Sequence, residues 1–130
     1  MKFLDGFEGR AYALLRIVAG FMFCMHGVQK MFGVPEPMPV VLSVGSQVWF
    51  GSLIELFGGF LVMIGLQTRW AAFICSGMMA VAYTQFHWKL QWGADFFPLV
   101  NRGEPAVLYC FVFLYLACKG DGKWSLGFKS

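Results

Sequence analysis

Charged residues are scarce in this sequence. Asp, Glu, Lys and Arg make up only 13% of its 130 residues, compared with about 25% in a typical soluble domain. Hydrophobic residues make up 58% and include fifteen Phe and eight Met. A soluble chain this apolar would lack the polar surface to cover itself. The composition therefore excludes an ordinary soluble domain and indicates an integral membrane protein with a single domain over residues 1–130.

Cysteine motifs and dense charge clusters are missing as well. The four cysteines lie in apolar runs, form no C-x-x-C pair and have no His/Cys spacing typical of a metal site. We interpret them as small buried hydrophobes rather than redox or disulfide residues. The net charge of +3 is too small and too scattered to predict nucleic-acid binding. The N-terminus is acidic as well as basic and precedes a long apolar span with no small-residue cleavage site, so we expect no removable signal peptide.

Four apolar segments predict membrane-spanning helices. A spanning helix needs about 20 apolar residues, and the segments 11–32, 48–66 and 70–87 qualify. The fourth, over 104–119, would cover roughly 24 Å of a hydrocarbon core about 30 Å thick, so its start should be recessed. The five Trp lie at or just beyond the ends of these segments, as interfacial Trp does. We predict an all-α four-transmembrane-helix bundle.

The basic residues predict the orientation. With the N-terminus inside, the inner segments carry six of the ten Lys and Arg residues, and the outer loops carry only Lys89 and Arg102. The positive-inside rule therefore predicts that both termini are cytoplasmic. The loops 33–47 and 88–103 would lie outside. Residues 40–47, which follow a proline-rich helix stop, are expected to lie in the interface or to re-enter the membrane.

Ionisable residues inside the apolar segments are the main clue to function. Such side chains cost several kcal/mol each at membrane depth unless they are paired or face water. Arg16 lies in the inner half of the first segment, with no acid at its depth. The rise per residue brings the other polar candidates to one depth in the outer half of the bilayer. These candidates are His26, Lys30, Glu55, Tyr83, His87 and Glu104.

Helical spacing also predicts which faces turn inward. Small and polar residues recur in steps of three and four, which places them on one face of each helix. Small residues at such positions let helix backbones approach closely in lipid. The stripes are Arg16, Gly20, Phe23, Gly27 and Lys30; Gly51, Glu55, Gly58 and Val62; and Glu104, Leu108, Phe111, Tyr115 and Cys118.

Most of the candidates have a structural alternative to a functional role. Glu104 could act only as a helix cap, and Lys30 could extend to the outer interface. Arg16 could extend to phosphates of the inner leaflet, or it could contact Tyr115 or an inner-half ligand. Glu55 has the weakest alternative, because it is acidic and far from either end of its segment. Interfacial or helix-bonding alternatives remain open for Tyr83, His87 and His26.

Four stretches of the chain resemble the DoxX family of small membrane proteins. They are LLRIVAGFMFCMHGVQKMFG, ELFGGFLVMIGLQTRWAA, FFPLVNRGEPAVLY and GDGKWSLGF. The resemblance implies a four-helix bundle in a bacterial or archaeal plasma membrane. Relatives include the DoxD subunit of a thiosulfate:quinone oxidoreductase. The family's polar positions map onto Arg16, His26, Lys30, Glu55 and Glu104.

The first functional hypothesis is a membrane subunit of a quinone-linked oxidoreductase. A quinone needs an apolar slot and a few polar groups that bond its oxygens and move protons. His26 and Glu55 would relay protons as the catalytic residues. No haem, flavin or iron–sulfur motif is visible, so electrons would come from a partner or a small reductant. The residues expected to hold the quinone are Lys30, Tyr83, His87, Glu104 and Arg16.

Two other hypotheses remain. A non-enzymatic accessory subunit would stabilise a larger membrane complex, with the polar cluster as an internal staple, and a weaker alternative is a small-solute or proton conduit. Expected partners are the lipid bilayer, a quinone, and a larger complex or a second copy of the chain. We expect Glu55 to lie within reach of His26 or Lys30. We also expect an outward-opening cavity, rimmed by the loop 88–103 and lined by His26, Glu55, Tyr83 and Glu104.

Overall fold

The computed structural model describes residues 1–39 and 42–127, and these form helices and turns without a β-strand. A short 3-10 turn, η1, precedes the first long helix. Two of the later helices continue directly into π-helical turns. In chain order the elements are η1 (Lys2–Leu4), α1 (Glu8–Phe32), α2 (Gln47–Leu53), the π-helical η2 (Ile54–Gly58), α3 (Gly59–Ile64), α4 (Thr68–Ala82), the π-helical η3 (Tyr83–Trp88), η4 (Ala94–Phe96), α5 (Pro98–Asn101) and α6 (Glu104–Lys119).

Local sequence explains where several helices begin and end. Gly33 follows α1 with φ of 68°, a left-handed conformation that glycine adopts without strain. The Ser46 side chain accepts a hydrogen bond of 3.2 Å from the amide of Trp49 and so caps α2. Of the segment 40–47, for which we predict an interfacial or re-entrant path, residues 40 and 41 lie outside the described residues.

The longer helices pack as two pairs. α1 lies against the continuous stretch α2–η2–α3, and α4 lies along α6. Glycines allow the first pair to approach closely, because a Cβ on Gly20 would lie 2.5 Å from the Met63 amide nitrogen. A Cβ on Gly59 would lie 2.5 Å from the Cys24 amide nitrogen. The sequence predicts Gly20 at an interface but misses Gly59, because its predicted stripe runs through the neighbouring Gly58.

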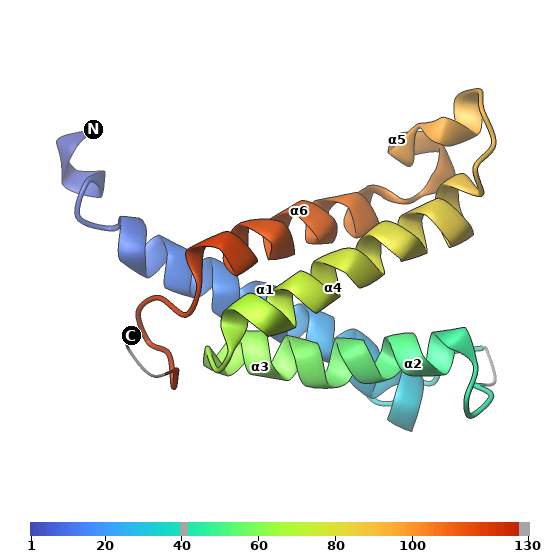
Figure 1. Ribbon diagram of the computed structural model, residues 1–130, viewed down its shortest axis with the longest axis horizontal. Helices are drawn as coiled ribbons and strands as arrows, with labels where there is room; N and C mark the ends of the chain where they lie inside the picture. The colour runs from blue at the N-terminus through green and yellow to red at the C-terminus, as the bar shows by residue number, and fades with distance from the viewer. Residues whose placement is uncertain (40–41, 128–130) are drawn as a thin grey trace.

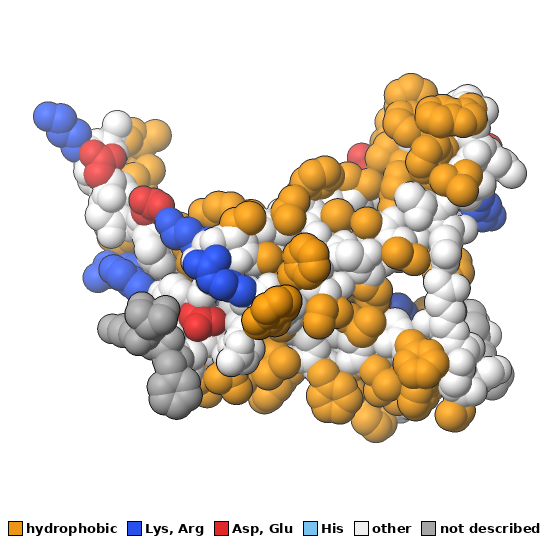
Figure 2. All heavy atoms as spheres, viewed as in Figure 1, with side chains coloured by type: hydrophobic (Ala, Val, Ile, Leu, Met, Phe, Trp, Pro, Cys, Tyr) orange, Lys and Arg blue, Asp and Glu red, His pale blue; other side chains and the backbone are white. Residues whose placement is uncertain are grey.

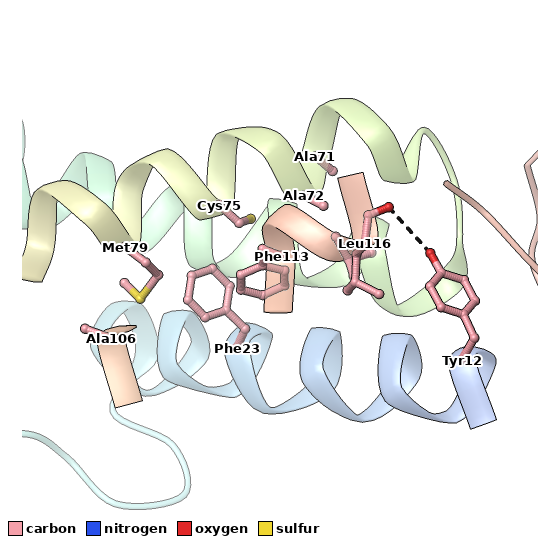
Figure 3. Close-up of a cluster of buried hydrophobic side chains, with 10 residues drawn as sticks. Tyr12, Phe23, Ala71, Ala72, Cys75, Met79, Ala106, Phe113 and Leu116 are labelled. Carbon is pink, nitrogen blue, oxygen red and sulfur yellow. Dashed lines mark hydrogen bonds between the residues drawn. The ribbon is translucent and has the colours of Figure 1, made fainter. Parts of the chain in front are cut away.

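The hydrophobic core lies between the two pairs. Phe23 of α1 and Phe113 of α6 are almost fully buried, and their rings meet edge to face with centroids 4.7 Å apart (Figure 3). Such an aromatic pair contributes about 0.5–1.5 kcal/mol beyond its area. Small residues of α4, including Ala72 and Cys75, let α6 pack closely. This core fixes α1 and α6 relative to each other.

The face that α6 turns inward differs from the predicted one. Leu108 is 67% exposed and Phe111 is 64% exposed. Glu104, Tyr115 and Cys118 are exposed too, so the predicted inward stripe of this helix is wrong. The helix is apolar on all sides, so polarity does not determine which face turns inward. Packing against the small residues of α4 determines it. The buried residues of α6 are Ala106, Phe113 and Leu116.

Apolar side chains also cover much of the outer surface. In the part of the chain that the structure describes, two helical stretches are long and apolar enough to cross a membrane, Glu8–Phe32 and Gln47–Ile64. α6 has 16 residues and is shorter. Figure 2 shows apolar side chains along the helices, while most of the charged side chains visible on this face gather near the N-terminus and the described C-terminal segment. We call this the termini end, and the opposite end, where α2 and α6 begin, the pocket end (Figure 1).

Candidate functional site: a pocket between two helix pairs

The two helix pairs diverge toward the pocket end and leave a pocket of about 380 Å³ between them (Figure 1). α1, α2–η2, α4–η3 and α6 all contribute to its walls. Most of the lining is apolar, with a few polar groups among it, as is usual for small-molecule sites. The lining residues are Phe23, His26, Lys30, Gln47, Val48, Gly51, Glu55, Met78, Met79, Val81, Ala82, Phe86, His87, Pro105, Ala106 and Tyr109.

Glu55 is the one acid among the described residues that line the pocket. It is 4% exposed and lies in the π-helical turn η2. Its Oε1 accepts a hydrogen bond of 2.7 Å from Nζ of Lys30, which reaches across from α1. The expectation that Glu55 lies within reach of Lys30 is therefore confirmed. The pairing gives Lys30 a partner inside the protein instead of at the outer interface.

Two buried polar atoms of the pocket residues have no partner. Among the described residues, neither Oε2 of Glu55 nor the hydroxyl oxygen of Tyr109 makes a hydrogen bond. Buried polar groups are nearly always hydrogen-bonded, so an exception needs an explanation. Glu55 and Tyr109 come from different helix pairs, and both line the same pocket. This arrangement is typical of a site that a polar ligand completes.

The two histidines lie on different walls. His26 of α1 lines the pocket from an exposed position, edge-on to the ring of Tyr109 with centroids 6.5 Å apart. His87 of η3 also lines it, and its Nδ1 lies 3.1 Å from the carbonyl oxygen of Asn101. Its ring stacks on that of Tyr83 with centroids 6.4 Å apart. The two imidazoles therefore line the pocket from different helix pairs.

Tyr83 and Glu104, two residues of the predicted cavity, do not line it. The Tyr83 hydroxyl donates a bond of 2.6 Å to the Phe96 carbonyl and accepts one of 3.2 Å from Asn101. Glu104 is exposed in the first turn of α6 and makes no capping bond through its side chain. The next two residues of the helix, Pro105 and Ala106, line the pocket instead. The predicted recessed start of α6 does not determine which of its first residues face inward.

The loop 88–103 supports the pocket from behind and does not rim it. None of its described residues contributes to the lining. Asn101 organises this loop, because its amide donates a bond of 2.8 Å to the Asp95 carbonyl and its Oδ1 accepts one of 2.8 Å from Gly103. The sequence offers one signal for the role of Asn101: asparagine favours turns, and this one lies between Pro98 and the next helix. At the mouth itself, Gln47 bonds to Gln85 of η3.

Both π-helical turns carry polar residues of the site. Glu55 lies in η2, and His87 lies in η3. A π-turn widens the helix by one residue and often occurs at functional sites. The extra residue rotates the following side chains, so the face of each helix changes at the pocket. Hydrophobic spacing in the sequence assumes a constant helix and does not reveal these turns.

Arg16 lies away from the pocket and is fully buried toward the termini end. Its Nη1 donates bonds of 2.8 Å to the carbonyls of Val62 and Met63. Its Nη2 donates bonds of 3.1 and 2.7 Å to the carbonyls of Lys123 and Trp124. The expected extension to lipid phosphates is therefore wrong. The guanidinium instead ties the end of α3 to the C-terminal segment, and backbone acceptors at that depth are invisible in the sequence.

A second hollow, of about 570 Å³, lies at the termini end between the start of α1 and the C-terminal segment. Its lining includes Tyr12, Lys119 and Lys123. No residue of this lining carries a buried polar atom without a partner among the described residues. It is larger than the pocket near Glu55 but has no polar group that calls for a ligand. We therefore assign the candidate site to the pocket.

The fold and the pocket define a class: a small helical protein with an apolar outer surface and a mostly apolar internal site that holds a few polar groups. A family model described as DoxX matches residues 11–88. An uncharacterised protein of Haemophilus influenzae is 38% identical over 99% of this chain and 97% of its own length. The chain belongs to the DoxX family of membrane proteins.

A more distant relative carries a functional name. A Bacillus subtilis protein named "Putative oxidoreductase CatD" is 37% identical over 43% of this chain and 44% of its own length. No solved structure is significantly similar to the chain. Family membership therefore accounts for the membrane character, and the chemistry has to be argued from the pocket.

Proposed function

We propose that this protein is a plasma-membrane subunit of a quinone-linked oxidoreductase and that it binds quinone in the pocket. The observation that carries this proposal is a pair of buried atoms without a partner among the described residues, Glu55 Oε2 and the Tyr109 hydroxyl, inside a mostly apolar pocket. A quinone combines an apolar ring with two polar oxygens, which matches this distribution. The name of the Bacillus relative is in keeping with oxidoreductase chemistry.

The residues present fit a quinone head group. The pocket volume of about 380 Å³ lies within the range of about 300–1,000 Å³ usual for small-ligand sites. Phe23, Met78 and Phe86 supply apolar contacts to a ring. The polar atoms are few and come from opposing walls, so they would fix the orientation of the ring. A quinone tail could extend between the helices into lipid, where the outer surface is apolar.

The bound quinone would supply reversible two-electron, two-proton chemistry, with electrons exchanged with a partner protein or a small reductant. The residues of this chain would hold the ring and move protons. Glu55 would accept or return a proton at Oε2, while the Lys30 ammonium keeps Oε1 fixed. The exposed imidazole of His26, which lines the same pocket, would pass that proton out of the pocket.

We also propose four membrane spans with both termini cytoplasmic. α4 continues into η3, so the two together form one helical stretch over residues 68–88. The N-terminus and the described C-terminal segment lie at the same end (Figure 1), as an even number of spans requires. The basic residues are concentrated at that end. The pocket would then lie in the outer half of the bilayer.

A second candidate function is a non-enzymatic accessory subunit of a larger membrane complex. The observation that favours it is the loop 88–103, where Trp92 is 82% exposed and Leu99 is 77% exposed. This loop is held in place by Asn101 and by a T-shaped contact between Trp88 and Trp92. A rigid apolar surface at the end of a helix pair suits a partner protein as well as the lipid interface.

Binding of a quinone to the purified protein tests the first proposal. A Cβ on Gly51 would meet only Met78 Sδ, at 3.7 Å, so Gly51→Phe should project a ring into the pocket without a backbone clash. Gly77→Phe is the matched control, because nothing lies within 4 Å of its Cβ. We expect decylubiquinone to bind with one-to-one stoichiometry to the wild type and Gly77→Phe, and not to Gly51→Phe. Failure of the wild type to bind quinone, together with a stoichiometric partner protein, would favour the accessory function.

A further inference from the structure

The two oxygens of the Glu55 carboxylate have different surroundings. Oε1 is bonded to the Lys30 ammonium, whereas Oε2 is buried without a partner among the described residues. Oε1 forms an ion pair with the Lys30 ammonium at 2.7 Å, and a carboxylate in an ion pair can only accept hydrogen bonds. The free Oε2 therefore calls for a ligand group that carries a hydrogen, such as a hydroxyl.

Tyr109 supplies the second polar atom, which the sequence does not single out. Its ring stacks on Phe113 with centroids 5.6 Å apart and tilts against Phe23 at 5.3 Å. These contacts fix the ring, so the hydroxyl is held in place before a ligand arrives. A phenolic hydroxyl both donates and accepts, so it can bond either a carbonyl or a hydroxyl oxygen. Tyr109 would therefore position the ligand without selecting its oxidation state.

We propose that the pocket binds the reduced, hydroxyl-bearing quinol in preference to the quinone. Glu55 Oε2 accepts the hydrogen bond of one ligand hydroxyl, and the Tyr109 hydroxyl bonds the second ligand oxygen. This inference rests on the proposed function and specifies which form of the ligand the site recognises. Glu55 determines the preference, and Tyr109 is a positioning residue.

The discrimination arises because the oxidised form has no hydrogen to donate. A quinone carbonyl facing Oε2 would place two acceptors together and leave both unpaired. Sites built to bond a hydroxyl strongly reject an analogue that lacks it. We expect a preference for quinol of about tenfold or more. Tighter binding of the reduced form makes the bound quinone easier to reduce, and a tenfold preference raises the midpoint potential of a two-electron couple by about 30 mV.

The test compares the two oxidation states of one probe. Decylubiquinone and its anaerobically reduced quinol are titrated into the detergent-purified full chain, and the dissociation constants are measured by calorimetry. The wild type should bind the quinol at least about tenfold more tightly. Glu55→Gln should lose this preference, because a glutamine amide offers a donor as well as an acceptor. Tyr109→Phe should weaken both forms by a similar factor and keep the preference.

Two further variants keep the result interpretable. Lys30→Gln combined with Glu55→Gln removes both charges, so it tests the preference if the single Glu55 variant does not fold. Tyr12→Phe deletes a hydroxyl that bonds the Gly120 carbonyl at the termini end, and it should leave both dissociation constants unchanged. Tyr109→Phe removes a hydroxyl that has no partner among the described residues, so the thermal stability of this variant should stay near that of the wild type.

The outcomes separate this inference from the proposed function. Equal affinity of the wild type for both forms would overturn the inference and leave quinone binding intact. A preference that persists in the Glu55 variants would overturn the role of Oε2. A wild type that binds neither form would overturn the proposed function itself.

Discussion

Nζ of Lys30 lies 2.7 Å from Oε1 of Glu55, which joins α1 to η2 at the pocket. The side chain of Lys30 is 25% exposed, and that of Glu55 is 6% exposed. Breaking a buried pair leaves one charge without compensation and costs more than the pair itself contributes. The pair is therefore both a structural contact and the means of holding a carboxylate ready inside the pocket.

We predict that Lys30→Met lowers the free energy of unfolding in mild detergent by on the order of 3 kcal/mol, the low end for a buried pair because Lys30 is partly exposed. The double variant with Glu55→Gln should regain much of that loss, since no charge is then left alone. A double-mutant cycle on thermal unfolding measures the coupling. Additive effects of the two substitutions would show that the pair is incidental.

Arg16 should be important for stability but not for ligand binding. Its guanidinium bonds four carbonyl oxygens, and hydrogen bonds to a charged group are worth about 1.5–3 kcal/mol each. Arg16→Lys should therefore destabilise the protein strongly, because an ammonium cannot reproduce the planar fork. Arg10→Lys, at an exposed position, is the matched control. Loss of quinone affinity in an Arg16 variant that remains folded would argue against this assignment.

Asn101 should hold the loop that supports His87. Asn101→Ala removes the bonds to Tyr83, the Asp95 carbonyl and the Gly103 amide. We expect faster amide hydrogen exchange across 94–103 and a several-fold weaker quinone affinity, with helices α1 and α3 unaffected. Asn101→Asp keeps the acceptor for Gly103 and should have a smaller effect on exchange. Unchanged exchange in the alanine variant would mean that the loop is held by its aromatic contacts alone.

The proposed topology has a direct test. A reporter that works only in the cytoplasm should be active when fused at Ser130 and inactive when fused within the loop 88–103. A reporter that works only outside the membrane should give the opposite result. A control fusion in the turn at residue 67 should behave like the C-terminal one. An external C-terminus would reverse the orientation and place the pocket in the inner half of the membrane.

The helices and the principal ion pair could be predicted from the sequence. Apolar runs and Trp positions mark the segments, and α6 spans Glu104–Lys119, the range expected from its pattern. Shared depth was enough to bring Lys30 and Glu55 together, because rise per residue is nearly constant along a helix. The close approach at Gly20 followed from its small size at a regular spacing.

Other parts of the site depend on information that a helical pattern does not carry. α6 is apolar on every side, so the sequence could not show that Tyr109 faces inward and Tyr115 outward. The partners of Arg16 are backbone carbonyls of a distant segment, which no residue type reveals. Tyr83 lies one turn from His87 as predicted, yet its hydroxyl is taken by the Phe96 carbonyl.

Photolabelling with an azido-quinone tests the central claim most directly, because it locates the bound ligand on the chain. The labelled residues are identified by mass spectrometry, with excess decylubiquinone as competitor and Gly51→Phe as the blocked control. We predict competable labels within 47–58 or 104–110, the segments that carry Glu55 and Tyr109. Competable labels confined to the hollow at the termini end, around Tyr12 and Lys123, would contradict the account.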